Sequence, residues 1–231
     1  MRSGRVSPRD GVVVIIPAKP LARAKTRLRT SSAIDSRACA LAFLLDTIHA
    51  ATRAVSVRAV MVVSDDHTVR RWAAGLGCHL ADQGPAPGLN AAIRHGAACA
   101  ARRLGPSPCA ALVADLPALR PAELDEALAE ARTSPSSAFV RDAAGNGTTL
   151  LVAGAAELLR PSFGRSSAHN HESRGALPLQ VAVPSLRLDV DTPADLHTAA
   201  RIGLGPYSSA IYQRLTAVRP ADPTPTTSFL V

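Results

Sequence analysis

The sequence predicts an α/β fold, in which helices cover both faces of a mostly parallel central sheet to give three layers. Up to the expected helix that begins at Pro121, short apolar runs alternate with longer segments that suit helices, the pattern typical of parallel strands joined by helical crossovers. Runs such as 12–17 and 59–64 are continuously apolar and β-branched, as expected for strands buried on both faces. With 231 residues, 47% of them hydrophobic, the chain can bury a sizeable core.

The first half of the chain contains four expected strand–helix pairs. The strands are 12–17, 59–64, 78–81 and 110–114, and the helices are 36–52, 67–75, 88–103 and one that begins at Pro121. Asp35 or Ser36 is the expected N-cap of the first helix and Asp66 that of the second, because short polar side chains accept hydrogen bonds from the first free N–H groups. Proline suits the first turn of the fourth helix, where its missing N–H costs nothing.

The regular alternation of strands and helices ends after the helix that begins at Pro121. Asn146-Gly147 separates the apolar runs 137–142 and 148–153, a strong signal for a β-hairpin. The polar segment 164–174 reads as a loop that leads into a helix, 186–190 as a last strand, and 193–202 as a last helix. We therefore divide the chain into an N-terminal extension (1–10), one domain (11–204) and a Pro/Thr-containing C-terminal tail (205–231), with mobile chain expected from Gly205 onward.

The charge distribution bears on possible partners. The net charge is +8, and residues 1–37 alone carry nine basic and two acidic side chains. A local positive region suits a small polyanion as well as a polymer, and only 3% of the residues are aromatic, too few for a surface on which single-stranded bases stack. A nucleic-acid-binding protein therefore remains the less favoured alternative, and we expect no nucleic acid partner.

The cysteines and the hydropathy pattern indicate a cytoplasmic protein. The four cysteines form no CxxC pair, so reduced thiols are expected rather than a zinc site or a disulfide framework. His169 and His171 have no further ligand nearby in sequence, and we expect no zinc there either. The apolar run 12–16 is too short for a signal peptide, and no stretch approaches the length of a membrane span.

The basic side chains after the first strand predict a phosphate site. Lys19 and Lys25 are the only two lysines among 26 basic residues. A lysine is a compact point charge that can reach between phosphate oxygens, whereas arginine forks onto a planar acceptor. Ligands of open parallel sheets bind beyond the carboxyl ends of the strands, so a loop that carries Lys19, Lys25 and Arg27 at this place is a candidate for binding a polyphosphate.

Three aspartates predict a divalent cation at the same edge. Asp115 ends a buried strand, and Asp189 and Asp191 form a D-x-D pair whose side chains would face the same side of an extended chain. Carboxylates together with substrate phosphates are what Mg²⁺ prefers. Two of the aspartates also have a structural interpretation: Asp115 could simply cap a helix or stabilise a turn, and Asp191 could cap the helix that starts at Pro193.

Taken together, these motifs resemble a known family, the guanylyltransferases that activate 2-phospholactate or phosphoenolpyruvate with GTP in the biosynthesis of coenzyme F420. The matching segments are IIPAKPLARAKTRL (15–28), VVSDD (62–66), GLNAAI (88–93), ALVADLPAL (111–119), GNGTTLL (145–151), FGRSSAHNH (163–171) and LRLDVDTPADL (186–196). They run in order across residues 12–203.

The resemblance implies a single-domain nucleotidyltransferase fold of the GT-A type and a reaction that transfers GMP from GTP to phosphoenolpyruvate or 2-phospholactate. It implies Mg²⁺ on Asp115, Asp189 and Asp191, and the acceptor on Thr148, Gly164 and Ser167. Lys19, Lys25 and Arg27 would be catalytic and would hold the triphosphate, with Gly88 and Asn90 near the nucleotide base. The expected partners are GTP and a small phosphorylated acid, with a second copy of the chain as a further candidate, and no membrane.

Other assignments remain open at this point. A nucleotidyltransferase of the same fold could act on a molybdopterin, a sugar phosphate or methylerythritol phosphate. Such enzymes typically have a glycine-rich loop after the first strand, whereas this chain has Pro17-Ala18-Lys19-Pro20. An inactive nucleotide-binding or scaffolding relative is a further alternative. We favour phosphoenolpyruvate as the acceptor, since the Arg- and Ala-rich composition is typical of a bacterium with high GC content.

Overall fold

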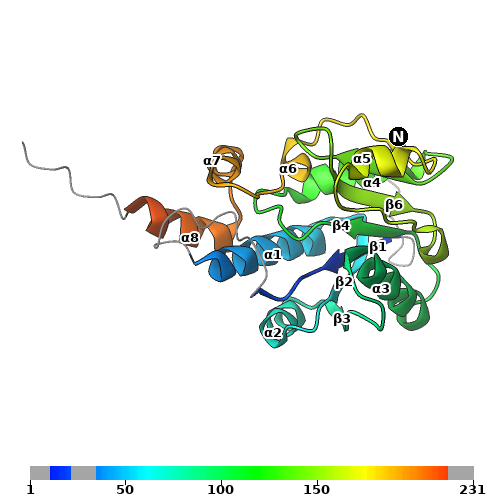
Figure 1. Cartoon of the computed structure of the whole chain (residues 1–231), viewed down its shortest axis with the longest axis horizontal. Coiled ribbons are helices and arrows are strands. Elements are labelled where there is room, and N and C mark those ends of the chain that lie inside the picture. The colour runs from blue at the N-terminus through cyan, green and yellow to red at the C-terminus, as the bar shows by residue number, and fades with distance from the viewer. Residues whose placement is uncertain (1–10, 22–34, 218–231) are drawn as a thin grey trace, which may run out of the picture.

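The computed structural model describes residues 11–21 and 35–217. Within these ranges the strands form one seven-stranded sheet, in the order β3-β2-β1-β4-β6-β5-β7 (Figure 1). The strands are β1 (Val12–Pro17), β2 (Val57–Val63), β3 (His79–Ala81), β4 (Cys109–Leu112), β5 (Ala138–Arg141), β6 (Thr148–Ala153) and β7 (Leu177–Pro178). Only the two pairings of β6, with β4 and β5, are antiparallel. The mostly parallel sheet predicted from the sequence is therefore confirmed.

Helices cover both faces of this sheet. One face packs against α1 (Ser36–Arg53), α2 (His67–Gly75), α4 (Pro121–Arg132) and α6 (Pro184–Arg187). The other face packs against α3 (Leu89–Leu104), the 3₁₀ turn η3 (Ala156–Leu158) and α5 (Ser167–Glu172). Beyond the sheet, α7 (Pro193–Ile202) and α8 (Pro206–Ala217) form a third apolar cluster with the start of α1. None of the helices in the described ranges is long and apolar enough to cross a bilayer.

The central strand β1 shows why the apolar runs of the sequence are continuous. Val12, Val14 and Ile16 belong to the core on one face of the sheet, and Val13 and Ile15 belong to the core on the other. Successive side chains of a strand point to opposite faces. A strand with helices on both faces therefore needs an apolar residue at every position.

The helix boundaries follow from the caps. As predicted, the carboxylates of Asp35 and Asp66 accept hydrogen bonds from the first N–H groups of α1 and α2, and Pro121 stands in the first turn of α4. The cap of α7 differs from one interpretation of the sequence. Thr192, and not Asp191, is the N-cap, and it forms a reciprocal capping box with Asp195.

One predicted strand is wrong. We expected residues 186–190 to form a last strand, but the chain instead forms the short helix α6 and continues without regular structure. Pro184 begins the helix, where its restricted φ suits the first turn. The Glu123 carboxylate accepts the N–H of Ser185 at 2.7 Å and holds the start of the helix against α4. The apolar and polar residues of this segment alternate as in a strand, but the proline and this contact determine its conformation.

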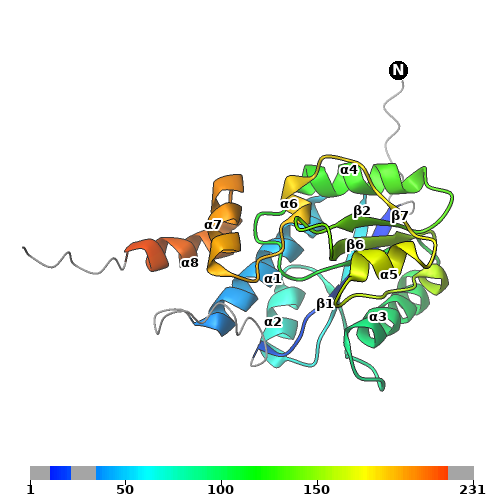
Figure 2. The ribbon, with the colours of Figure 1, turned by 45° about the horizontal axis from the view of Figure 1, so that its top comes forward.

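The expectation of mobile chain from Gly205 is wrong for the part of the tail that the structure describes. Residues 206–217 form α8, which lies beside the first half of α1 and points away from the sheet (Figures 1 and 2). The buried carboxylate of Asp46 in α1 accepts the N–H groups of Tyr207 and Ser208 at 3.0 and 2.7 Å. It therefore satisfies two N–H groups in the first turn of α8, which would otherwise lack partners. The division of the chain into domain and tail stays a prediction.

Candidate functional site

The main pocket lies beside β1, where the order in which the strands are added to the sheet reverses. From β1 the chain proceeds outward to β2 and β3, and then returns to place β4 on the other side of β1. Crossovers that leave in opposite directions open a crevice at the carboxyl ends of such strands. A pocket of about 250 Å³ lies at this place. Its lining includes Ala18 after β1, Ala114 and Asp115 after β4, and Leu89 of α3.

Lys19 lies at the mouth of this pocket, as predicted. The N–H of Ala18 donates to the carbonyl of Val63 at 2.9 Å, which continues the pairing of β1 with β2 by one residue. The next residue, Lys19, is exposed and lines both the main pocket and a neighbouring hollow of about 350 Å³, which Gly88 also lines. Lys25 and Arg27 lie outside the described residues.

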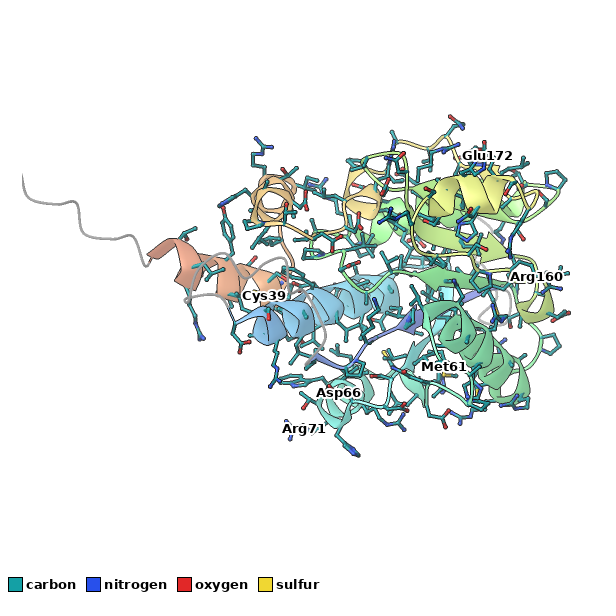
Figure 3. All side chains as sticks on the ribbon, in the orientation of Figure 1. Cys39, Met61, Asp66, Arg71, Arg160 and Glu172 are labelled. Carbon is teal, nitrogen blue, oxygen red and sulfur yellow. The ribbon has the colours of Figure 1, made fainter. Side chains whose placement is uncertain are left out.

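Asp66 anchors the chain that carries Lys19. Its Oδ2 accepts the N–H of Leu21 at 3.1 Å, while its Oδ1 accepts the first N–H groups of α2. Desolvation acts to raise the pKa of this carboxyl, but the donors, with Leu21 first, hold its pKa below the usual value. Figure 3 shows Asp66 at the start of α2, beside the chain that leaves β1. One carboxylate therefore holds both the start of α2 and the chain at Leu21, two residues after Lys19.

The three predicted aspartates come together. Asp115, Asp189 and Asp191 all line the main pocket, and the N–H of Val190 donates to the main-chain carbonyl of Asp115 at 3.0 Å. Burial, followed by the negative charges of Asp115 and Asp191, raises the pKa of Asp189 to about 7. The segment with Asp189 and Asp191 is not a strand as predicted. Its two carboxylates still line the same pocket as Asp115, because the hydrogen bond from Val190 joins this segment to the end of β4.

This arrangement suits a cation that arrives with a substrate. Within the described ranges, no three His, Cys, Asp or Glu side chains are grouped closely enough to hold a metal ion by themselves. Mg²⁺ is usually held by one or two carboxylates and completed by water and substrate phosphates. Burial, and after it the charges of Asp115 and Asp191, raises the pKa of Asp189, and a cation beside these carboxylates would offset both effects. The residues present therefore fit Mg²⁺ accompanied by a polyphosphate.

The predicted acceptor residues are on β6 and on the turn into α5. Because β6 runs opposite to its neighbours, it begins at the edge where β1 and β4 end; the N–H of Val113, just after β4, donates to the carbonyl of Thr149 at 3.0 Å. Thr148, the first residue of β6, is therefore at the edge of the sheet where β4 ends, and it is buried. Gly164 has a φ of 128°, a conformation that favours glycine. Its carbonyl accepts the N–H of Ser167, the buried first residue of α5.

Asn90 connects α3 to the loop that precedes Gly164. Its side-chain oxygen accepts the N–H of Phe163 at 2.8 Å, and its side-chain nitrogen donates to the carbonyl of Phe163 at 3.0 Å. Phe163 itself lines the main pocket and directly precedes Gly164. The amide group of Asn90 is thus engaged in positioning this loop, and its predicted contact with the nucleotide base stays a prediction, as does that of Gly88.

Sequence reasoning missed the importance of three residues. It favoured a capping role for Asp66 over a functional one, it considered His171 only as a metal ligand, and it gave no role to Phe163. The position of Asp66 at the end of β2 was a usable signal. The partners of His171 and Phe163 are more than eight residues away along the chain, so no local pattern could reveal them.

Comparisons with known proteins place the chain in a family. The chain matches the family described as "Guanylyl transferase CofC like" over residues 12–226. It is 48% identical to a phosphoenolpyruvate guanylyltransferase of Streptomyces scabiei, with 87% of this chain and 96% of that protein covered. It is 47% identical to the protein of the same name in Streptomyces coelicolor, with 87% and 96% covered.

Solved structures show the same fold at low identity. A protein of Desulfovibrio desulfuricans assigned as a nucleotide-diphospho-sugar transferase has a TM-score of 0.66 and 15% identity, covering 90% of this chain and 96% of that one. A 4-diphosphocytidyl-2C-methyl-D-erythritol synthase has a TM-score of 0.59 and 14% identity, covering 84% and 98%.

The fold and the relatives together define the class of this protein, which is an enzyme of the nucleotidyltransferase type. More specifically, the chain belongs to the family of CofC-like guanylyl transferases. The predicted fold class and family resemblance are therefore confirmed.

The first prediction concerns Asp66. Asp66→Asn keeps an oxygen that can cap α2, but its amide group would oppose the N–H of Leu21. We expect the KM for the nucleotide to rise about 3- to 10-fold, while the melting temperature changes by less than about 2 °C. Steady-state kinetics and thermal denaturation measure the two effects. Asp125→Asn, which alters a carboxylate that accepts the N–H groups of Val55 and Ser56, is the matched control. An unchanged KM in Asp66→Asn would show that the anchor does not matter.

The second prediction concerns stability and pH. The folded pKa of Asp189 lies above its ordinary value, so the folded state holds the proton more tightly than the unfolded state. The contribution of Asp189 to stability is therefore fully present near pH 4 and is lost as pH rises to about 7. With metal chelated, Asp189→Asn should melt at least about 2–4 °C above the parent at pH 8, and the difference should shrink toward pH 4. A difference that does not vary with pH would contradict the assignment.

Proposed function

We propose that this enzyme transfers GMP from GTP to phosphoenolpyruvate, releases pyrophosphate and thereby makes the activated precursor of coenzyme F420. The observation that carries the proposal is that Lys19, Asp115, Asp189 and Asp191 line one pocket at the carboxyl ends of β1 and β4. Membership of a guanylyl transferase family supports GMP as the transferred group. The names of the Streptomyces relatives support phosphoenolpyruvate as the acceptor, with 2-phospholactate as the other candidate.

The chemistry is a displacement at the α-phosphorus of GTP. An oxygen of the acceptor phosphate forms a bond to the α-phosphorus, and the bond from that phosphorus to the oxygen bridging it to the β-phosphorus breaks. The electron pair of the broken bond leaves with pyrophosphate. The attacking phosphate is already ionised at neutral pH, so no side chain has to remove a proton.

The basic loop would hold the triphosphate. Lys19, together with Lys25 and Arg27, would neutralise the charge that develops on the departing pyrophosphate. Asp66 supports this role through the chain that follows Lys19, since the bond from the N–H of Leu21 fixes where the loop starts.

Asp115, Asp189 and Asp191 would hold Mg²⁺. When bound, the ion would offset the repulsion between two polyanions and polarise the phosphate under attack. The raised pKa of Asp189 means that cation binding competes with a proton near neutral pH.

The acceptor would bind at the turn into α5. The main chain at Gly164 and the side chains of Ser167 and Thr148 would receive its phosphate or carboxylate, where their N–H and O–H groups serve as donors. Gly88 and Asn90 would lie near the guanine base across the pocket.

The proposed compartment is the cytoplasm, where free thiols such as the four cysteines here persist.

The third prediction tests this function. We expect pyrophosphate release when the enzyme receives Mg²⁺, GTP and phosphoenolpyruvate, and little release with ATP, CTP or UTP. Mass spectrometry should find the guanylylated acceptor, and 2-phospholactate in a parallel reaction ranks the two acceptors. Asp115→Asn should fold normally and lose at least about 100-fold in rate. No product from GTP with either acceptor, together with product from a sugar phosphate or methylerythritol phosphate, would refute the proposal; full Mg²⁺-dependent release by Asp115→Asn would refute the metal assignment.

A further inference from the structure

The buried side chain of His171 connects the elements that the proposed acceptor site uses. His171 is on α5, and its side chain is 1% exposed. Its Nε2 accepts the N–H of Ser162 at 2.9 Å, and its Nδ1 lies 2.9 Å from Oγ1 of Thr148. The ring packs edge-on against Phe163 and lies at a tilt to Phe139, with centroid distances of 5.1 and 5.8 Å. The ring is therefore held in place on its faces and at both nitrogens.

These contacts determine which nitrogen of His171 carries the hydrogen. A main-chain N–H can only donate, so Nε2 must offer its lone pair to Ser162. In a neutral imidazole the other nitrogen then carries the hydrogen, and Nδ1 donates to Thr148. Burial, and secondarily the charge of Arg174, lowers the pKa of His171 to about 4, which agrees with a neutral ring near pH 7.

The direction of this bond determines what Thr148 can do. A hydroxyl has one hydrogen to donate and two lone pairs. Because Oγ1 of Thr148 accepts from His171, its own hydrogen remains available to donate in another direction. Among the described residues Thr148 has no other side-chain hydrogen bond. The hydroxyl is thus prepared as a donor to an anion at the edge of the sheet where Asp115 lies.

We propose that His171 is a positioning residue that holds the hydroxyl of Thr148 as a donor toward the anionic group of the phosphorylated acceptor, and that it orders the loop from Ser162 to Gly164 for the same ligand. The inference rests on the proposed function and adds to it the residue that positions the acceptor site. From α5, the side chain of His171 holds both β6, through Thr148, and the loop, through Ser162. His171 does not touch the reacting atoms; it acts through Thr148 and through the main chain at Ser162.

Two substitutions separate the roles of the two ring nitrogens. In His171→Asn, the side-chain amide can place an N–H near the position of Nδ1, which keeps the donor to Thr148 and loses the acceptor for Ser162. In His171→Gln, the longer side chain can place its oxygen near the position of Nε2, which keeps the acceptor for Ser162 and loses the donor. Thr148→Val removes the hydroxyl and keeps the shape. His169→Gln, on the exposed side of the same helix, is the control.

The fourth prediction is a selective loss of acceptor binding. Steady-state kinetics with GTP and phosphoenolpyruvate should show that Thr148→Val raises the KM for the acceptor about tenfold, the effect of one well-aligned hydrogen bond. His171→Gln should raise it nearly as much, and His171→Asn by clearly less. The KM for GTP should stay within about twofold in all variants. The double variant Thr148→Val/His171→Gln should be no worse than Thr148→Val alone, because both changes remove the same interaction.

The outcomes distinguish this inference from the function on which it rests. If the parent enzyme makes no product from GTP and either acceptor, the proposed function fails and the inference falls with it. If the parent is active but His171→Gln keeps the parent's KM for the acceptor, the inference alone is wrong. It is also wrong if His171→Asn and His171→Gln raise both KM values equally and in proportion to their loss of thermal stability, since that result would indicate a purely structural residue.

Discussion

The order of the strands around β1 determines where the pocket and the residues that follow its strands lie. The chain leaves β1 in one direction for β2 and β3 and returns to the other side for β4, so the crevice between the ends of β1 and β4 is not covered by a crossover. Lys19 and Asp115 line this crevice simply because they follow those two strands. The reversed direction of β6 then brings Thr148 to the same edge.

Electrostatics gives this shared edge its chemical character. Two polyanions can approach each other there only if positive charge compensates for their repulsion. In the proposed function Lys19 would supply part of that charge, and a cation held by Asp115, Asp189 and Asp191 would supply more. Burial, together with the nearby charges of Asp115 and Asp191, raises the pKa of Asp189, so its ionised form is disfavoured in the fold. Such a trade between stability and activity is common where function requires unfavourable charge in one place.

Most of the strands and helices, and the positions of Lys19 and Asp115, could be predicted from the sequence, because the relevant signals are local. Continuous apolar runs, caps such as Asp35 and Asp66, and proline at the first turn of α4 are each contained in a few residues. The site residues Lys19 and Asp115 could be placed because each follows a recognisable strand. Lys25 and Arg27 lie outside the described residues, and their roles stay predictions.

The errors arise where contacts distant in sequence decide the structure. The alternating pattern at 186–190 suggests a strand, but the proline at 184 and the carboxylate of Glu123 make its start helical. The segment after Gly205 looks mobile by composition, but Asp46, about 160 residues earlier, stabilises α8. Likewise, the bonds of Asn90 to Phe163 join residues 73 positions apart. These partners can be identified only in the folded chain.

The central claim is that the acids of the crevice and a nucleoside triphosphate hold a divalent cation jointly. Electron paramagnetic resonance of Mn²⁺, used in place of Mg²⁺, measures this directly by titration of the enzyme with and without GTP. The account predicts weak Mn²⁺ binding to the enzyme alone, and binding of Mn²⁺ with GTP that is at least about tenfold tighter than to either enzyme or GTP separately. Tight binding without nucleotide, or no gain over GTP in free solution, would contradict it.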